Sequence, residues 1–237
     1  MKMLQGKKAL ILGGSRGMGA AIVKRFANEG ADVTFTYSGS AEAARVLADE
    51  TETSTEQVDS GDLDALTRFI ARQGALDILV ISAGVFIMGN PLEQDPNDID
   101  RMIDINVRSP YHASIEAAKK MKDGGRIIVI GSVNGDRMPM EGAAAYAMTK
   151  SAIQGMVRGL ARDLGGRGIT VNNVQPGPVD TDMNPADGPH SEFMHSFLAL
   201  KRHGKAEEIA GMVAYLAGPE ASFITGAQHT IDGGFGA

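Results

Sequence analysis

Short, continuously apolar runs alternate along the chain with longer segments in which apolar residues recur every three or four positions. In the runs 78–81 and 127–130 every residue is isoleucine, leucine or valine, so both faces of the chain are apolar. This pattern is typical of parallel strands that helices cover on both sides of a sheet. Strands are expected at Lys7–Leu12, Asp32–Tyr37, Thr55–Asp59, Asp77–Ile81, Arg126–Ile130, Thr170–Gln175 and Gln228–Ile231.

The longer segments between these runs predict helices. Regular alternation of strand and helix implies right-handed βαβ units. We therefore expect an α/β fold: a single-domain, Rossmann-type, doubly wound parallel sheet of about seven strands, with helices on both faces. A length of 237 residues fits one such domain, spanning 1–237. The expected helices are Met18–Glu29, Ala41–Glu50, Asp62–Arg72, Asn97–Met121, Ala144–Leu164 and Ala206–Ala217.

One segment, Asn184–Leu200, interrupts this alternation after the sixth predicted strand. It combines two prolines and a glycine with a group of apolar residues that includes two phenylalanines. We expect it to be a mobile lid over a substrate site. Its apolar side chains favour an apolar or amphipathic substrate over a highly charged one.

Composition excludes several classes of protein. Apolar residues make up 43% of the chain, enough for a core, and the absence of cysteine excludes disulfides, thiol catalysis and thiolate metal sites. The net charge of −6 argues against nucleic acid as a partner, because phosphate binding needs a basic face. No apolar run approaches the ~20 residues that span a bilayer, and no signal segment is evident. We expect no membrane association and a cytoplasmic location.

A glycine-rich turn follows the first predicted strand and precedes the first predicted helix, with the sequence Gly13-Gly14-Ser15-Arg16-Gly17-Met18-Gly19. Glycines in this position allow a sharp turn and let backbone amides approach a pyrophosphate, which the helix N-terminus stabilises. The order strand, glycine turn, helix therefore predicts a dinucleotide site. A turn that only packs the helix on the strand is the alternative.

Tyr146 and Lys150 lie four positions apart in a predicted helix, so both project from one face. A tyrosine hydroxyl with its ordinary pKa near ~10 is a poor acid–base group at neutral pH. A neighbouring ammonium favours the phenolate, so Lys150 is expected to lower the pKa of Tyr146 toward neutrality. A surface pair that arises by chance is the alternative, because Y-x-x-x-K is a common spacing.

Taken together and in order, these motifs resemble the classical short-chain dehydrogenase/reductase family over essentially the whole chain. Within that family the sequence is similar to 3-oxoacyl-[acyl-carrier-protein] reductases. The elements that carry the resemblance are the G-x-x-x-G-x-G turn at 13–19, Ser82-Ala83-Gly84 in place of N-A-G, Asn106, Ser132, the Y-x-x-x-K element at 146–150, and Pro176-Gly177 with Thr181.

The resemblance implies an NADPH-dependent reductase that converts a ketone to an alcohol. It assigns Tyr146 as the proton donor to the substrate oxygen and Lys150 as a ligand of the nicotinamide ribose. Ser132 holds the carbonyl oxygen, and Asn106 supports a water relay to Lys150. Family members pair long helices across dimer interfaces and often form tetramers, so a homotetramer or homodimer is implied.

The choice of cofactor follows from the second predicted strand, which ends without the acidic residue that commonly binds the ribose hydroxyls of NAD. Arg16 with the Ser38 and Ser40 hydroxyls could receive a 2′-phosphate, so NADP(H) is expected over NAD(H). Asp59 resembles the family's adenine-contacting aspartate, and capping of the next helix is the alternative. The full cofactor set implied by the resemblance is Gly13, Ser15, Arg16, Gly17, Met18, Gly19, Tyr37, Ser38, Asp59, Ser60, Ser82, Ala83, Gly84, Tyr146, Lys150, Pro176, Gly177, Val179 and Thr181.

A second hypothesis is a nucleotide-binding regulator on the same scaffold. The stretches 131–139, 200–204 and 229–237 are similar to regulatory members of the family that bind cyclic-di-GMP in biofilm dispersal. The R-x-x-x-R spacing of Arg158–Arg162 suits two phosphates, but Arg68–Arg72 has the same spacing, so solvated arginines are the simpler interpretation. An intact catalytic set can coexist with regulatory binding.

Two further groups of residues carry weaker signals. His190, His195 and His203 are close in sequence, but spacings of five and eight do not form a metal-ligand pair on one helix face. We expect exposed or substrate-loop histidines and no metal. Met138 and Met140 fit an apolar substrate wall as well as ordinary packing.

Overall fold

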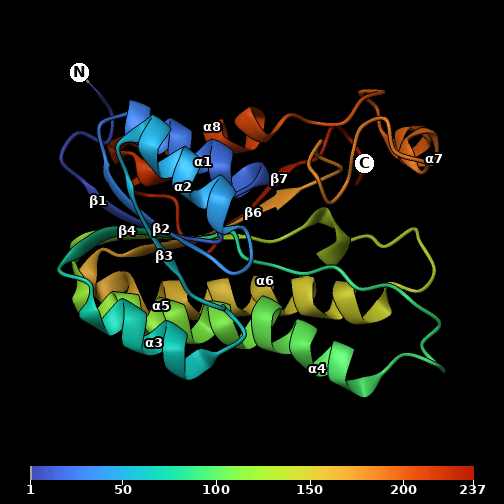
Figure 1. The fold of residues 1–237 in the computed structure, drawn as a ribbon, viewed down its shortest axis with the longest axis horizontal. Coiled ribbons are helices and arrows are strands. Elements are labelled where there is room, and N and C mark those ends of the chain that lie inside the picture. Colours follow the sequence, from blue (N-terminus) through green and yellow to red (C-terminus); the bar gives the residue numbers. More distant parts are fainter. Residues whose placement is uncertain (1) are drawn as a thin grey trace.

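Seven parallel strands form one sheet in the order β3-β2-β1-β4-β5-β6-β7 in the computed structural model, which describes residues 2–237 (Figure 1). Every neighbouring pair in this sheet is parallel. The predicted α/β fold is therefore confirmed. The strands are β1 (Lys8–Leu12), β2 (Asp32–Tyr37), β3 (Ser54–Gln57), β4 (Leu76–Ile81), β5 (Met121–Ile130), β6 (Thr170–Pro176) and β7 (Gln228–Ile231).

Helices cover both faces of the sheet, with α1, α2 and α8 on one side and α3, α4, α5 and α6 on the other (Figure 1). Each predicted helix exists with bounds within two residues of the prediction, except the segment 97–121. The helices are α1 (Gly17–Asn28), α2 (Ala41–Thr51), α3 (Leu63–Arg72), α4 (Pro96–Ile103), α5 (Ser109–Lys120), α6 (Ala144–Leu164), α7 (Ser191–Phe197) and α8 (Ala206–Ala217), with a π turn η1 (Asp104–Arg108) and the 3₁₀ turns η2 (Val133–Gly135), η3 (Gly165–Arg167) and η4 (Pro219–Ala221).

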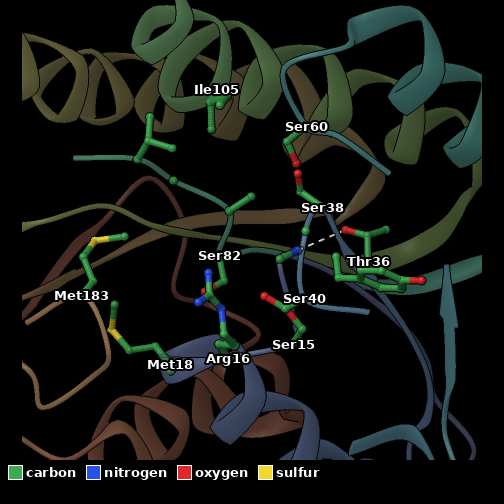
Figure 2. Close-up of a pocket in the computed structure, with 18 of the residues that line it drawn as sticks. Ser15, Arg16, Met18, Thr36, Ser38, Ser40, Ser60, Ser82, Ile105 and Met183 are labelled. Carbon is green, nitrogen blue, oxygen red and sulfur yellow. Dashed lines mark hydrogen bonds between the residues drawn. The ribbon is translucent and has the colours of Figure 1, made fainter. Parts of the chain in front are cut away.

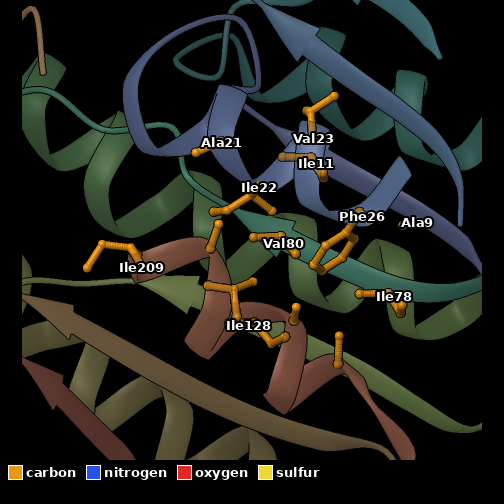
Figure 3. Close-up of a cluster of buried hydrophobic side chains, with 14 of the residues drawn as sticks. Ala9, Ile11, Ala21, Ile22, Val23, Phe26, Ile78, Val80, Ile128 and Ile209 are labelled. Carbon is orange, nitrogen blue, oxygen red and sulfur yellow. The ribbon is translucent and has the colours of Figure 1, made fainter. Parts of the chain in front are cut away.

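Two apolar clusters, one on each face of the sheet, form the core. Side chains of β1 alternate between them, with Ile11 on the α1 side and Leu10 on the opposite side. Ile22 and Phe26 of α1 are fully buried against strand residues such as Val80 (Figure 3). Each such side chain stabilises the fold by roughly 1.5–3 kcal/mol relative to leaving it exposed. Burial on both faces explains the continuous apolarity of the central strands.

Three predicted elements differ from the structure by more than one residue at an end. β5 begins at Met121 rather than Arg126, because Met121 pairs with Leu76 and a register shift then passes over residues 122–125 before Arg126 pairs with Ile78. β3 ends at Gln57, which leaves Asp59 in the following loop. The single helix predicted over 97–121 is instead α4, a π turn and α5 in succession.

The position of the site follows from the strand order. β1 lies between β2 and β4, so the connections diverge to the two sides of β1, and a crevice opens at the carboxyl ends of these strands. The predicted lid segment contains the short helix α7. No helix within residues 2–237 combines the length and the apolarity required to span a membrane.

Candidate active site

The glycine turn between β1 and α1 has a backbone that side chains would disturb. Gly13 and Gly17 have positive φ angles of 78° and 52°, a region that glycine occupies without strain. A Cβ on Gly13 would lie 2.7 Å from the Ala83 backbone, and one on Gly19 would collide with the Gly13 carbonyl oxygen. The Gly13 amide donates to Thr36 Oγ1 at 3.1 Å (Figure 2). No side chain caps α1, so its N-terminal amides face the crevice as an anion site.

Gly19→Ala is therefore expected to lower the thermal stability of the protein, because the new methyl group forces α1 away from the glycine turn. The matched control is Gly211→Ala in α8, where a Cβ meets only the flexible end of Arg25, 4.0 Å away. Alanine has the higher helix propensity, so the control should be neutral or stabilising by up to ~1 kcal/mol. Equal melting temperatures for the two variants would show that the turn tolerates a side chain at position 19.

A cavity of about 560 Å³ lies along the carboxyl ends of β1 to β4 (Figure 2). Fourteen of the predicted cofactor residues line it: Gly13, Ser15, Arg16, Gly17, Met18, Gly19, Tyr37, Ser38, Asp59, Ser60, Ser82, Ala83, Gly84 and Thr181. Five do not: Tyr146, Lys150, Pro176, Gly177 and Val179. Ser40, predicted as a receiver of the 2′-phosphate, also lines it, and eight lining residues were not predicted: Thr36, Gly39, Val58, Val85, Arg101, Ile105, Asp182 and Met183.

The loop after β6 reaches this cavity from the other side of the sheet. The Gly177 amide donates to Ile231 O at 3.1 Å, and a Cβ on Gly177 would lie 2.7 Å from Asp232 Cα, so the loop packs closely on β7. Thr181 packs against the glycine turn: a Cβ added to Gly17 would lie 3.2 Å from the Thr181 methyl carbon. Val179 is 5% exposed and belongs to the core rather than to the cavity wall.

Lys150 of α6 is a buried ammonium with one hydrogen-bond partner in the protein. Its Nζ donates to the Ile130 carbonyl oxygen at 3.2 Å, and its side chain is nearly inaccessible. Burial lowers the pKa of Lys150 to about 8, because desolvation disfavours the charged form. Gly84, which lines the cavity, lies close to the Lys150 ammonium: a Cβ added to Gly84 would lie 3.6 Å from Nζ.

Tyr146 lies one helical turn before Lys150, and Nζ is 5.6 Å from the centre of its ring. Burial raises the pKa of Tyr146, while a hydrogen bond with Ser132 opposes this increase. The predicted direction, a lowering by Lys150, is therefore wrong for this structure, because the ammonium does not bond the hydroxyl and desolvation dominates. Phe86, which the sequence motifs did not indicate, packs edge-on against the Tyr146 ring at 4.6 Å.

Asn106 lies in the π turn η1, a local widening that often marks functional positions in helices. Its side chain is 2% exposed and bonds both backbone groups of Val85 at 2.9 Å, and its Nδ2 also donates to Thr149 Oγ1 at 3.2 Å. Oδ1 would lie 3.5 Å from a Cβ on Gly84. Asn106 and Lys150 therefore border the same glycine.

Ser132 follows β5 and begins the turn η2. Its Oγ accepts from the Asn134 amide and donates to Asn134 Oδ1, both at 3.1 Å. Gln175 of β6, another residue that the motifs did not indicate, donates to Ser132 O at 3.1 Å and to Asp136 Oδ2 at 2.6 Å. These bonds fix the backbone of the turn that presents the serine.

Asp59 and the serines after β2 line the cavity beside the ends of β2 and β3. Asp59 accepts from the Gly61 amide at 2.9 Å and from Arg101. Burial alone would raise the pKa of Asp59, but these bonds outweigh it and lower the pKa. The alternative that Asp59 caps the next helix is wrong, because Asp62 caps α3 through the Ala65 amide.

The weaker candidates resolve as follows. The histidines were expected to be exposed or to belong to the substrate loop. His203 is buried, at 5% exposed, and its Nδ1 lies 2.8 Å from Nε2 of His195, which belongs to α7 in the predicted lid. No group of three or more potential metal ligands occurs within residues 2–237. Met138 Sδ accepts from Asn134 Nδ2 at 3.2 Å, which places it beside the Ser132 turn.

Comparison with known proteins decides the family. The family model described as "Enoyl-(Acyl carrier protein) reductase" matches residues 13–236. The chain is 62% identical over 237 residues to the cyclic-di-GMP-binding biofilm dispersal mediator protein of Escherichia coli (strain K12), with all of both chains covered. It is 34% identical to the 3-oxoacyl-[acyl-carrier-protein] reductase MabA of Mycobacterium tuberculosis (strain ATCC 25618 / H37Rv), over 97% of this chain and 93% of MabA. The chain belongs to the short-chain dehydrogenase/reductase family.

The solved structures agree with this assignment. A crystal structure of BdcA in complex with NADPH has a TM-score of 0.98 and 62% identity, and the alignment covers 99% of this chain and 96% of BdcA. The predicted family and fold are confirmed. As a short-chain dehydrogenase/reductase, the protein is an oxidoreductase.

Proposed function

We propose that this protein is an NADPH-dependent reductase that converts a ketone to an alcohol, with Tyr146 as the proton donor. The observation that carries the proposal is that Lys150 and Asn106 lie beside Gly84 in the wall of a cavity built around a glycine turn, with Tyr146 and Ser132 hydrogen-bonded to each other next to Lys150. The reductase activity in the name of the relative MabA supports the same reaction class.

The cavity fits a phosphorylated dinucleotide. The absence of side chains at Gly13 and Gly19 leaves backbone amides and the α1 N-terminus free to bind a pyrophosphate. Ser38, Ser40 and Arg16 line the end where an adenosine 2′-phosphate would lie, and Arg16 remains 62% exposed, with only a 3.9 Å contact to Asp182. The NADPH bound by the relative BdcA supports this choice of cofactor.

When bound, the reduced nicotinamide supplies the hydride for the carbonyl carbon. Tyr146 holds a proton on its hydroxyl at neutral pH, because burial raises its pKa, and is therefore prepared to donate it to the substrate oxygen. Ser132, whose hydrogen bond opposes the rise in the pKa of Tyr146, would orient the same oxygen. Lys150, with a pKa of about 8, can return a proton near neutral pH through the space beside Gly84 and Asn106.

The substrate would enter from the side of the predicted lid, Asn184–Leu200. Phe197 of α7 packs edge-on against Phe235 at 5.7 Å, in a cluster with Val133, the residue after Ser132. Phe193 stacks edge-on with Phe197 at 5.0 Å and is half exposed. The lid therefore presents aromatic surface beside the proposed catalytic serine, which favours an apolar or amphipathic ketone.

The test is an NADPH-oxidation assay with a β-ketoacyl thioester, a β-ketoester, a vicinal diketone and a cyclic ketone. Turnover that the Tyr146→Phe variant lacks would support the proposal and rank the substrate classes. NADPH binding without turnover of any of the four compounds would count against a ketone reductase.

NADPH is expected to be used at least about tenfold more efficiently than NADH, since a charge-assisted bond to the 2′-phosphate is worth about 1.5–3 kcal/mol. Arg16→Ala should reduce this ratio, because Arg16 is the cation at that end with the loosest intramolecular pairing. The measurement is kcat/KM for both nucleotides. A wild-type preference for NADH would contradict the assignment of the 2′-phosphate site.

A second function, sequestration of cyclic-di-GMP, is favoured by the 62% identity, over the full length, to the E. coli biofilm dispersal mediator, whose name states that it binds this nucleotide. The two functions are compatible, since an enzyme can also bind a signalling dinucleotide. Calorimetric titration at micromolar cyclic-di-GMP is expected to show saturable binding. An absence of heat in a titration with active protein would dispose of this function.

The homodimer or homotetramer implied by the family stays a prediction. Tyr111 of α5 and Met148 of α6 are each about half exposed, apolar side chains on the helices that family members pair. Sedimentation analysis of the wild-type protein would measure the oligomeric state directly.

A further inference from the structure

The adenosine end of the cavity contains an ion pair between two elements that are distant in sequence. Arg101 of α4 places Nη2 at 2.7 Å from both carboxylate oxygens of Asp59. Both residues line the cavity, and each side chain is a little less than half exposed. A side chain at Gly61 would collide with the Arg101 guanidinium, so glycine at this position lets the arginine cross the loop to reach Asp59.

The charges that line the cavity make the ion pair between Arg101 and Asp59 important for binding of the cofactor. The charged residues that line it are Arg16, Asp59, Arg101 and Asp182. Asp182 is only loosely paired with Arg16, at 3.9 Å, whereas Asp59 is tightly paired with Arg101. Asp59 lies one residue before Ser60, whose side chain points toward that of Ser38 in Figure 2. The amide of Val58, the residue before Asp59, donates to Tyr37 O at 2.8 Å, so the loop that carries Asp59 lies beside the loop that carries Ser38, at the end of the cavity assigned to the 2′-phosphate.

A 2′-phosphate ester carries between one and two negative charges at neutral pH. An unpaired carboxylate at the same end of the cavity would repel this group more strongly than it repels the uncharged 2′-hydroxyl of NADH. Neutralisation of that carboxylate is consequently a condition for accepting the phosphorylated nucleotide, separate from the attraction that Arg16 provides.

We infer that Arg101 determines specificity for the phosphorylated dinucleotide by neutralising Asp59 at the adenosine end of the cavity. Arg101 acts through Asp59, so its effect is on discrimination between NADPH and NADH rather than on the chemical step. This inference rests on the proposed function, because it presupposes that the cavity binds NADPH.

The experiment measures equilibrium binding of NADPH and of NADH from the fluorescence of the reduced nucleotides. Arg101→Ala is expected to weaken NADPH binding about fivefold and NADH binding much less, the size expected for one unpaired unit charge at a half-exposed site that water screens. Adding Asp59→Asn to Arg101→Ala should restore the NADPH-to-NADH ratio. Arg101→Lys should keep the ratio near the wild-type value, since a single nitrogen makes both contacts to Asp59.

The matched control is Arg72→Ala, which removes an exposed 2.7 Å pair with Glu56 that does not line the cavity. Equal weakening of both nucleotides by Arg101→Ala, an unchanged ratio, or no recovery in the double variant would overturn the inference. Melting temperatures identify any variant that fails to fold, and Arg101→Lys then still tests the charge. A wild-type protein that binds neither nucleotide would refute the proposed function itself, whereas NADPH binding with an unchanged ratio in Arg101→Ala refutes only the role of Arg101.

Discussion

Tyr146→Phe is expected to lower kcat for ketone reduction by about 100-fold to 10,000-fold, the range over which positioned general acids contribute. The variant removes the one hydroxyl that the proposed mechanism uses as a proton donor. It keeps the aromatic ring and therefore the edge-on contact with Phe86. Because Tyr146 does not line the cavity, NADPH binding should be retained.

The measurement combines steady-state NADPH oxidation with fluorescence titration of NADPH on the same preparations. Tyr111→Phe is the matched control, since it removes a hydroxyl from a half-exposed tyrosine on α5 that does not line the cavity. Activity of Tyr146→Phe within about tenfold of wild type would be too small a loss for a general acid and would assign proton donation to another group.

The sequence predicted the fold well because its strongest signal is a direct consequence of burial. β1, β4 and β5 are covered on both faces, so their apolar residues are continuous, and this is visible without any structure. The signal fails where burial is partial. The first residues of β5, Lys122 to Gly124, are exposed and polar, although the backbone there still belongs to the strand.

The glycine turn was also predictable, because a backbone requirement for glycine is written directly in the sequence. Fourteen of the predicted residues line the cavity, and most of them belong to the backbone segments that follow the ends of adjacent parallel strands. The contribution of Arg101 was not predictable in this way. It depends on a side chain from α4 that crosses Gly61 to a carboxylate 42 positions earlier, a contact that no local pattern records.

Electrostatic properties were the least predictable, since they depend on burial and distance together. The spacing of Tyr146 and Lys150 correctly indicates a shared helix face, but it says nothing of how far both groups are removed from water. In the structure desolvation dominates both, raising the pKa of the tyrosine and lowering that of the lysine. Tyr146 is therefore a neutral phenol at neutral pH, and Lys150 is an ammonium that loses its proton easily. Both groups are suited to donate protons during reduction.

Lys150→Met is expected to reduce kcat by at least about 100-fold, comparable to the loss of a preorganised electrostatic group at other active sites. The same substitution should leave the protein at least as stable as wild type at pH 7. The buried ammonium costs on the order of 3 kcal/mol, the equivalent of lowering its pKa from 10.5 to about 8. Methionine fills a similar volume without that cost.

The pH dependence of unfolding tests this explanation in protein without added nucleotide. Between about pH 8 and 10 the unfolded chain binds more protons at Lys150 than the folded chain, so wild-type stability should rise with pH. Tyr146 opposes this only above its ordinary pKa of 10.0, because its pKa is raised in the folded state. Lys150→Met should lack the rise, and its stability advantage should therefore shrink across this window. A variant that is less stable at pH 7, with a difference independent of pH, would mean that the ammonium is well paired in solution and that its proton is not weakly held.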